Sequence, residues 1–174
     1  MSLLLKKLYL LCSILLLAVG INAPSLALDG PPAALEHIDP HKKVITPEEY
    51  FWIEGQARFS ARVDSGAKST SIHAIEIEVE DAADTMMDNV GKQVNFNIVN
   101  EEGKTWSLSR RISSVTKVRN SQGVEYRYNV PLRLGWNGIN KTVDVNLRDR
   151  SKMTYKLLIG RDWMNREVVI DLEH

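Results

Sequence analysis

Apolar and polar residues alternate along most of the chain after Gly55. The alternation is clear in five segments, which cover residues 59–63, 75–79, 94–98, 124–134 and 143–147. A period of two is typical of strands with one face buried and the other in water. Turn-forming residues such as Trp136-Asn137-Gly138 separate several of the segments. The pattern predicts an all-β domain, folded as a closed or nearly closed barrel.

Helical patterns are rare. Residues 81–89 carry a weak one, and residues 161–167 form a better one just after Gly160. Thr46-Pro47-Glu48-Glu49 has the spacing of a capping box, with proline at the first helical position. The aromatic stretch that follows, residues 50–53, fits a strand equally well, so this segment stays open between helix and strand. We therefore expect one short helix near the C-terminus.

The first 27 residues have the three parts of a secretory signal. Lys6-Lys7 is the positive start, residues 8–19 form the apolar run, and Ser25-Leu26-Ala27 is a small-x-small cleavage site. The run is shorter than the ~20 residues of a membrane-spanning helix. The pattern predicts a signal peptide over residues 1–27, a periplasmic or secreted protein, and no stable membrane span after cleavage. An uncleaved N-terminal anchor is the alternative.

Residues 28–43 contain Gly30-Pro31-Pro32 and Pro40 without a sustained period. Such a composition is typical of a linker or an arm. We therefore place the folded domain at residues 44–171. No internal repeat is visible in it, so each sequence motif occurs once per chain.

Charge and cysteine content exclude several kinds of site. The chain has 22 basic and 22 acidic residues, whereas a binder of nucleic acid or anionic membranes would show a basic excess. Its single cysteine, Cys12, lies in the predicted leader, so the mature protein would have neither a disulfide nor a thiolate site. Any chemistry must then come from carboxylates, hydroxyls, a few histidines or the backbone.

Two motifs suggest chemistry. The alternating segment 59–63 leads directly into Asp64 and the turn-forming Ser65-Gly66-Ala67, which presents a carboxylate at a strand tip. Far downstream, the apolar residues 157–159 lead into Gly160-Arg161-Asp162 at the start of the short helix. Together these motifs resemble the retropepsin family of aspartic peptidases. That family has an apolar strand before Asp-Ser/Thr-Gly-Ala and an apolar pair before Gly-Arg-Asp/Asn.

The resemblance extends between the two motifs. Residues 128–135 are similar to the strand that follows the flap in these enzymes. The preceding hairpin, residues 112–127, occupies the flap position, with its tip at Asn120, Ser121, Gln122 and Gly123. Residues 61–68 and 149–153 resemble more closely a bacterial group described as retropepsin-like, which carries an older label of ATP-dependent zinc protease.

The residues do not support that older label. The four histidines, at positions 37, 41, 73 and 174, are not spaced as zinc ligands beside a glutamate. A P-loop needs glycine directly before Lys-Ser/Thr, and Ala67 stands there instead. We therefore expect neither a metal nor a cofactor.

The resemblance implies a homodimer, because a retropepsin chain supplies one catalytic aspartate. Asp64 would be the shared acid and base, and Ser65 would hydrogen-bond across the two-fold axis. Gly66 would let the chain turn close to the substrate, and Arg161 would brace the active-site loop. The partners implied are a second copy of the chain and a peptide or protein substrate, with no nucleic acid.

One departure from the family affects substrate binding. Retroviral members carry acids two and three places after the glycine, where this chain has Lys68 and Ser69. Arg161 then needs another partner, for which Glu76, Glu78 and Asp162 are candidates. A different function also remains open. A non-catalytic module of the same fold could bind a peptide or an envelope partner.

Overall fold

The computed structural model describes residues 41–120 and 123–173. The predicted leader and all but the last residues of the predicted linker lie outside these ranges. The strands are β1 (Lys43–Ile45), β2 (Glu48–Ile53), β3 (Ala57–Val63), β4 (Ser71–Val79), β5 (Gln93–Val99), β6 (Thr105–Arg111), β7 (Ser114–Asn120), β8 (Gly123–Trp136), β9 (Ile139–Arg148), β10 (Leu157–Ile159) and β11 (Val168–Ile170). They are joined by a 3-10 turn, η2 (Met87–Asn89), and one short helix, α2 (Arg161–Met164).

Six strands form a closed ring. They are hydrogen-bonded in the order β10-β3-β2-β8-β9-β4, and β10 also pairs with β4. The short β10 therefore bridges two strands, parallel to β3 and antiparallel to β4. A closed ring leaves no unpaired edge among its members. The all-β, barrel-like fold expected from the alternation is confirmed.

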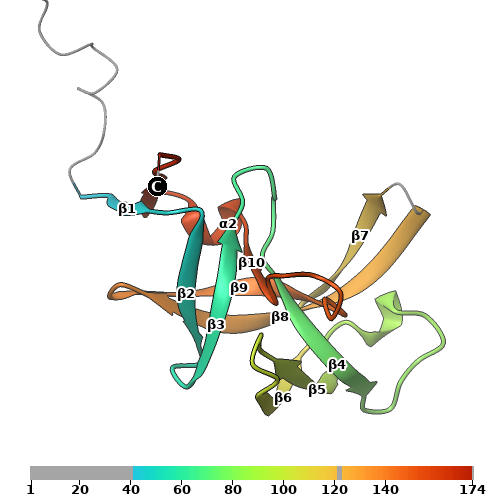
Figure 1. Cartoon of the computed structure of the whole chain (residues 1–174). Helices are drawn as coiled ribbons and strands as arrows, with labels where there is room; N and C mark the ends of the chain where they lie inside the picture. The colour runs from blue at the N-terminus through green and yellow to red at the C-terminus, as the bar shows by residue number, and fades with distance from the viewer. Residues whose placement is uncertain (1–40, 121–122, 174) are drawn as a thin grey trace, which may run out of the picture. The chain divides into compact units, whose positions relative to one another are not determined.

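The core fills this ring from one face of each strand. In β3 the predicted face is the buried one, with Phe59, Ala61 and Val63 inside. Trp163 of α2 is fully buried against Phe51, with ring centroids 4.8 Å apart, and its Nε1 donates to the Leu134 carbonyl at 3.3 Å. The aromatic contact fixes α2 against the ring, next to the end of β10 (Figure 1).

Strand β4 departs from the expected alternation. The residues of its first half are buried, whereas Ile77, predicted to share a buried face with Ile75 and Val79, is exposed. The pairing with β5 shifts register between Ile75 and Glu78, and Glu76 has a φ of 52°. A bulge of this kind turns the following side chains toward the other face. Strands β5 and β6 extend the sheet beyond the ring on this side.

Strands β7 and β8 form the hairpin predicted at the flap position. Asn120 pairs with Gly123, and the tip residues Ser121 and Gln122 lie outside the described ranges. Figure 1 shows the hairpin projecting from the ring, at the end of β8 far from the β8–β9 turn. The expected alternation is wrong here, because Val124 and Tyr126 are about half exposed while Arg127 is buried. Buried polar side chains on the hairpin need polar partners, which the next subsection describes.

The helical expectations were partly wrong. The segment left open at residues 46–49 leads into strand β2, although the backbone N–H of Thr46 still donates to Glu49 Oε1 at 3.4 Å as in a capping box. Residues 81–89 form only turns and η2, where Thr85 Oγ1 bonds Asp88 Oδ2 at 2.7 Å. Helix α2 ends at Met164, because Asn165 already has extended backbone angles.

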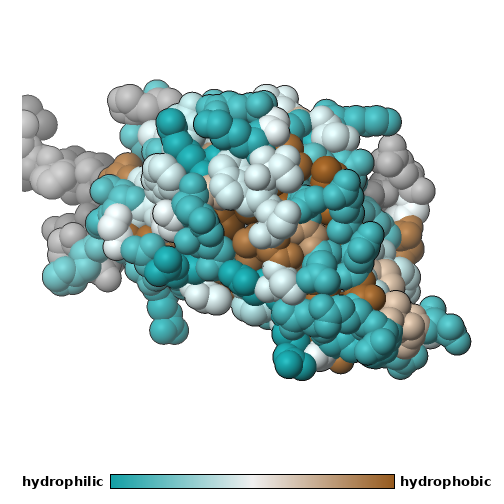
Figure 2. All heavy atoms as spheres, turned by 90° about the horizontal axis from the view of Figure 1, so that it is seen from below, coloured by the Kyte–Doolittle hydropathy of each residue, from teal (hydrophilic) through white to brown (hydrophobic). Residues whose placement is uncertain are grey.

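The two ends of the domain meet in a small separate sheet. Strand β11 pairs in parallel with β1 over three residues. Most of the surface seen from below is hydrophilic, with apolar atoms visible between the polar side chains (Figure 2). In the described part of the chain, no helix has the length and hydropathy needed to span a membrane.

Candidate active site

Asp64 is held at the point where β3 leaves the ring. Its backbone N–H donates to the Ile159 carbonyl at 3.0 Å, so the adjacent strand β10 fixes its position. Its Oδ1 accepts the N–H of Gly66 at 2.8 Å, and its carbonyl accepts the N–H of Ala67 at 3.1 Å. A Cβ on residue 66 would lie 3.1 Å from Asp64 Oδ1, so glycine permits this close approach. The carboxylate is thus oriented by its own turn.

Arg161 lies across this turn from the start of α2. Its guanidinium donates to the carbonyls of Ser65 at 2.7 Å and Gly66 at 3.2 Å, and its backbone N–H donates to Ala67 at 3.0 Å. Carbonyl oxygens therefore take the place of the carboxylate partners suggested for Arg161. Of the three candidates, Asp162 bonds Thr70 and Glu76 bonds Asn97 of β5. Glu78 lies in the half of β4 that pairs with β5.

Thr70 is a functional-site residue that the sequence reasoning missed. Its buried hydroxyl donates to Asp162 Oδ1 at 2.7 Å and accepts the N–H of Gly160 at 3.1 Å, and its own N–H donates to Asp162 Oδ2 at 2.9 Å. A Cβ on Gly160 would lie 2.5 Å from the Ser69 carbonyl carbon. These contacts tie both ends of the Asp64 loop to the Gly-Arg-Asp segment.

Asn146 of β9 connects the hairpin to the same loop. Its Nδ2 donates to the Thr70 carbonyl at 2.7 Å, and its Oδ1 accepts from Arg127 of the hairpin at 3.2 Å. Arg127 also bonds Glu125 at 2.7 Å, and this hydrogen bond lowers the pKa of the Glu125 carboxyl. A continuous set of buried polar contacts therefore runs from the hairpin to the turn that carries Asp64.

The hairpin and the Asp64 loop line one cavity. Its volume is about 460 Å³, and its walls include Ala67, Lys68 and Ser69 of the loop and residues 116–119 of β7. The predicted flap thus shares a cavity with the predicted catalytic loop. Ser65 is exposed, and it lines a second cavity with Arg161, beside β11.

His73 lies on β4, two residues after Ser71, which lines the cavity between the hairpin and the Asp64 loop. It is buried, its Nδ1 accepts the backbone N–H of Arg150 at 3.0 Å, and it lies 3.6 Å from Asp149 Oδ1. Burial lowers the pKa of this imidazole, against the opposing effect of Asp149. Over residues 41–120 and 123–173, no three His, Cys, Asp or Glu side chains gather as metal ligands would.

A family model described as the retropepsin-like aspartic endopeptidase RimB matches residues 44–174. The chain belongs to this RimB-like family. Membership confirms the resemblance drawn from the Asp-Ser-Gly-Ala and Gly-Arg-Asp motifs. It agrees with the closed ring and with the position of β10 between β3 and β4.

Other similar proteins are longer or have no assigned function. Two probable alpha-L-glutamate ligases, from Parasynechococcus marenigrum and Shewanella halifaxensis, are 28% and 30% identical over 138 residues. The matches cover 76% and 75% of this chain but 28% and 29% of the ligases, so the RimB-like chain corresponds to less than a third of their length. A crystal structure of a Legionella pneumophila protein of unknown function is 26% identical, with a TM-score of 0.60, and the match covers 75% of this chain and 94% of that one.

Proposed function

We propose that this RimB-like chain is an exported aspartic endopeptidase that acts as a homodimer. The observation that carries the proposal is the Asp64 turn, in which Gly66 orients the carboxylate and Arg161 holds the loop from α2. Such fixed geometry suits a group that must meet a water molecule and a peptide carbonyl in turn. The predicted leader supports export.

One carboxylate per chain calls for a second copy. During hydrolysis, one Asp64 takes a proton from the attacking water while the other, protonated, gives its proton to the carbonyl oxygen. The Asp64 that took the water proton then gives it to the amine nitrogen as the C–N bond breaks, and the other Asp64 takes a hydroxyl proton from the intermediate as the C=O bond re-forms. Two carboxylates about 4 Å apart repel by about 4 kcal/mol at an effective dielectric of about 20. The pair would therefore share one proton over the working pH range.

The terminal strands support pairing between chains. Strands β1 and β11 are three residues each, and an isolated two-stranded sheet is marginally stable in water. Two apolar side chains at this sheet, Val44 and Leu172, are 63% and 80% exposed. Strands from a second chain would cover these residues and extend the sheet. The second cavity, which joins Ser65 and Arg161 to β11, lies at the same place.

The longer relatives are named as probable ligases, and this chain matches less than a third of their length. We infer that their ligase activity depends on the part that this chain does not match. The site described above offers carboxylate chemistry, which suits hydrolysis of an amide.

A peptide-cleavage screen between pH 4 and 7 tests the proposal. We expect Asp64→Asn to lower the cleavage rate by about 10²–10⁴-fold, the usual contribution of a general acid–base group. Asp144→Asn, on the exposed side of β9, is the matched control and should retain the rate. Equal residual cleavage by the unmodified chain and Asp64→Asn would overturn the peptidase and favour the binding module.

A further inference from the structure

A cavity without charged lining residues lies at the turn between β8 and β9. Two tryptophans, Trp52 and Trp136, two asparagines, Asn137 and Asn140, and three glycines line it, and we call it the Trp52 cavity. Its volume is about 430 Å³, within the range of roughly 300–1,000 Å³ that ligand pockets commonly have. The cavity between the hairpin and the Asp64 loop, by contrast, has six basic lining residues. The two cavities therefore differ in chemistry.

The Trp52 cavity exists because a glycine occupies the middle of a row across three strands. Trp52 of β2 pairs with Gly135 of β8, and Gly135 pairs with Asn140 of β9. Paired residues point to the same face of a sheet, and neighbouring strands lie about 4.8 Å apart, so the backbones at Trp52 and Asn140 are about 10 Å apart. Asn140 Oδ1 would lie 2.7 Å from a Cβ on residue 135, so its carboxamide leans over the glycine. An indole and a carboxamide therefore border the same open space.

Trp52 is the exposed aromatic residue of this row. It is 48% exposed, whereas Phe51 and Ile53 on either side of it are fully buried. Tyr50, on the same face of β2, is also about half exposed, but Arg58 lies 3.8 Å over its ring in a cation–π contact. Within the described ranges, no aromatic ring or cation covers the Trp52 indole in this way. A single exposed tryptophan is ordinary, but one that walls a concave cavity can contact a ligand.

The polar groups of the cavity are carboxamides carried by a tight turn. Asn137 and Gly138 have φ values of 44° and 80°, as in the two-residue turns that join antiparallel strands. Lys43 donates its ammonium group to the Asn137 carbonyl, which holds the turn from β1. Asn137 and Asn140 are exposed, and each carboxamide offers hydrogen-bond donors and an acceptor. The cavity thus combines a stacking surface with uncharged hydrogen-bonding groups.

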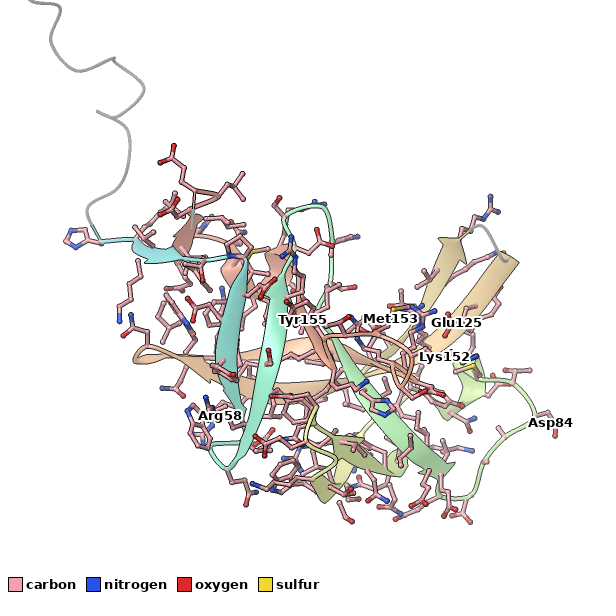
Figure 3. All side chains as sticks on the ribbon, in the orientation of Figure 1. Arg58, Asp84, Glu125, Lys152, Met153 and Tyr155 are labelled. Atoms are coloured by element: carbon pink, nitrogen blue, oxygen red, sulfur yellow. The ribbon has the colours of Figure 1, made fainter. Side chains whose placement is uncertain are left out.

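The Trp52 cavity lies away from the hairpin. Arg58 of β3 pairs with Trp52, and Figure 3 shows Arg58 on the opposite side of the molecule from Glu125 of the hairpin. A ligand in the Trp52 cavity would therefore leave the hairpin cavity open. An inference about this cavity does not depend on the proposed peptidase activity.

We propose that the Trp52 cavity binds a neutral sugar unit of a glycan. The apolar C–H face of a sugar ring stacks on an indole, and its hydroxyl groups hydrogen-bond to carboxamides, which matches the two kinds of lining group. The cations at the edge of the cavity, Lys43 and Arg133, do not line it, so a neutral ligand fits better than an anion. A peptide fits less well, because β2, β8 and β9 are paired on both sides in the ring and offer no free edge for strand addition. The predicted export would bring the chain to a compartment that contains glycans.

Titration of the full chain with neutral trisaccharides tests the proposal. The probes are cellotriose, maltotriose and triacetylchitotriose, followed through the NMR signals of the Trp52 indole N–H and the Asn140 carboxamide. We expect at least one of them to bind saturably at millimolar or lower concentration and to shift both signals. Absence of saturable binding by all three would overturn the proposal, as would tighter binding of an uncharged leucine tripeptide.

Three variants locate the bound sugar. Trp52→Ala removes the stacking surface and should weaken binding about tenfold or more, and Asn140→Ala removes one hydrogen-bonding group and should weaken it about threefold to tenfold. The matched control is Tyr50→Ala, because Tyr50 is an equally exposed aromatic residue on the same strand but does not line the cavity. We expect Tyr50→Ala to retain the affinity, and an equal loss there would overturn the assignment. Loss of a dimer in Trp52→Ala, measured by sedimentation, would make the cavity an interface between copies and would also overturn it.

Discussion

Strand β8 passes through the ring and the hairpin, and the side chains that it buries are apolar in the ring and polar in the hairpin. In the ring, Leu132 and Leu134 are fully buried, and polar neighbours such as Arg133 are exposed. In the hairpin, Val124 and Tyr126 are 50% and 49% exposed, whereas Arg127 and Asn129 are buried. The same alternating sequence is thus apolar-inward in one half and polar-inward in the other.

The two halves of β8 therefore have different roles: the ring half stabilises the fold, and the hairpin half positions polar side chains near the candidate site. The ring half packs against the core and contributes through burial of apolar area. The hairpin half contributes little apolar burial and instead positions Arg127 against Asn146 and Glu125. The polar-inward hairpin therefore contributes directed hydrogen bonds beside the Asp64 loop instead of core packing.

The largest predicted effect is a difference in the free energy of unfolding between a variant in the ring half of β8 and one in its hairpin half. Leu132→Ala removes a fully buried side chain from the ring and should lower the free energy of unfolding by about 2–5 kcal/mol. Val124→Ala, in the hairpin, should change it by less than about 0.5 kcal/mol. Urea unfolding of both variants measures the contrast. Similar losses would show that the hairpin is part of the core.

An intermediate effect concerns the loop that carries Asp64. Thr70→Val keeps the side-chain shape but removes the hydroxyl between Asp162 and Gly160, so we expect a loss of about 1–3 kcal/mol in unfolding free energy. Peptide cleavage should fall as well, because the loop loses two of the hydrogen bonds that join it to the Gly-Arg-Asp segment. Thr105→Val, exposed on β6, is the control. A stable and fully active Thr70→Val variant would show that the Thr70 hydroxyl does not hold the Asp64 loop.

The smallest effect concerns the ring alone, in the pH dependence of stability that His73 of β4 should cause. Burial lowers the pKa of His73 in the folded protein, so the unfolded chain binds more protons once the pH falls below about 6.5. Stability should therefore decrease as the pH falls from about 6.5 toward the lowered pKa of the folded state.

His73→Gln should flatten this decrease, whereas His41→Gln should retain it. The measurement is the urea midpoint across this pH window. If the unmodified chain and His73→Gln show the same pH dependence there, His73 is not the titrating group.

The sequence allowed a good prediction of the ring but not of its irregularities. The inward face of β3 follows from alternation, because no bulge interrupts Phe59, Ala61 and Val63. The bulge near Glu76 and the reversed faces of the hairpin leave the periodicity itself unchanged, so periodicity could not reveal them. Strand β10 is three residues long, and the apolar run before Gly160-Arg161-Asp162, not alternation, correctly marked it as a strand.

The site was predictable where a motif marks it. Asp64, Gly66 and Arg161 belong to recognisable short sequences. Thr70 and Asn146 act through hydrogen bonds to residues 76–92 positions away in the chain, which no local pattern shows. The cavity between the hairpin and the Asp64 loop likewise gathers residues from five separate segments of the chain.

In the proposed enzyme each chain supplies one Asp64, and pairing of two chains completes the site. The specific activity of the unmodified chain, measured on dilution and after addition of excess Asp64→Asn protein, tests this pairing. We predict that specific activity falls on dilution and falls further when the variant forms mixed dimers. A specific activity that is constant on dilution and indifferent to the variant would contradict the claim.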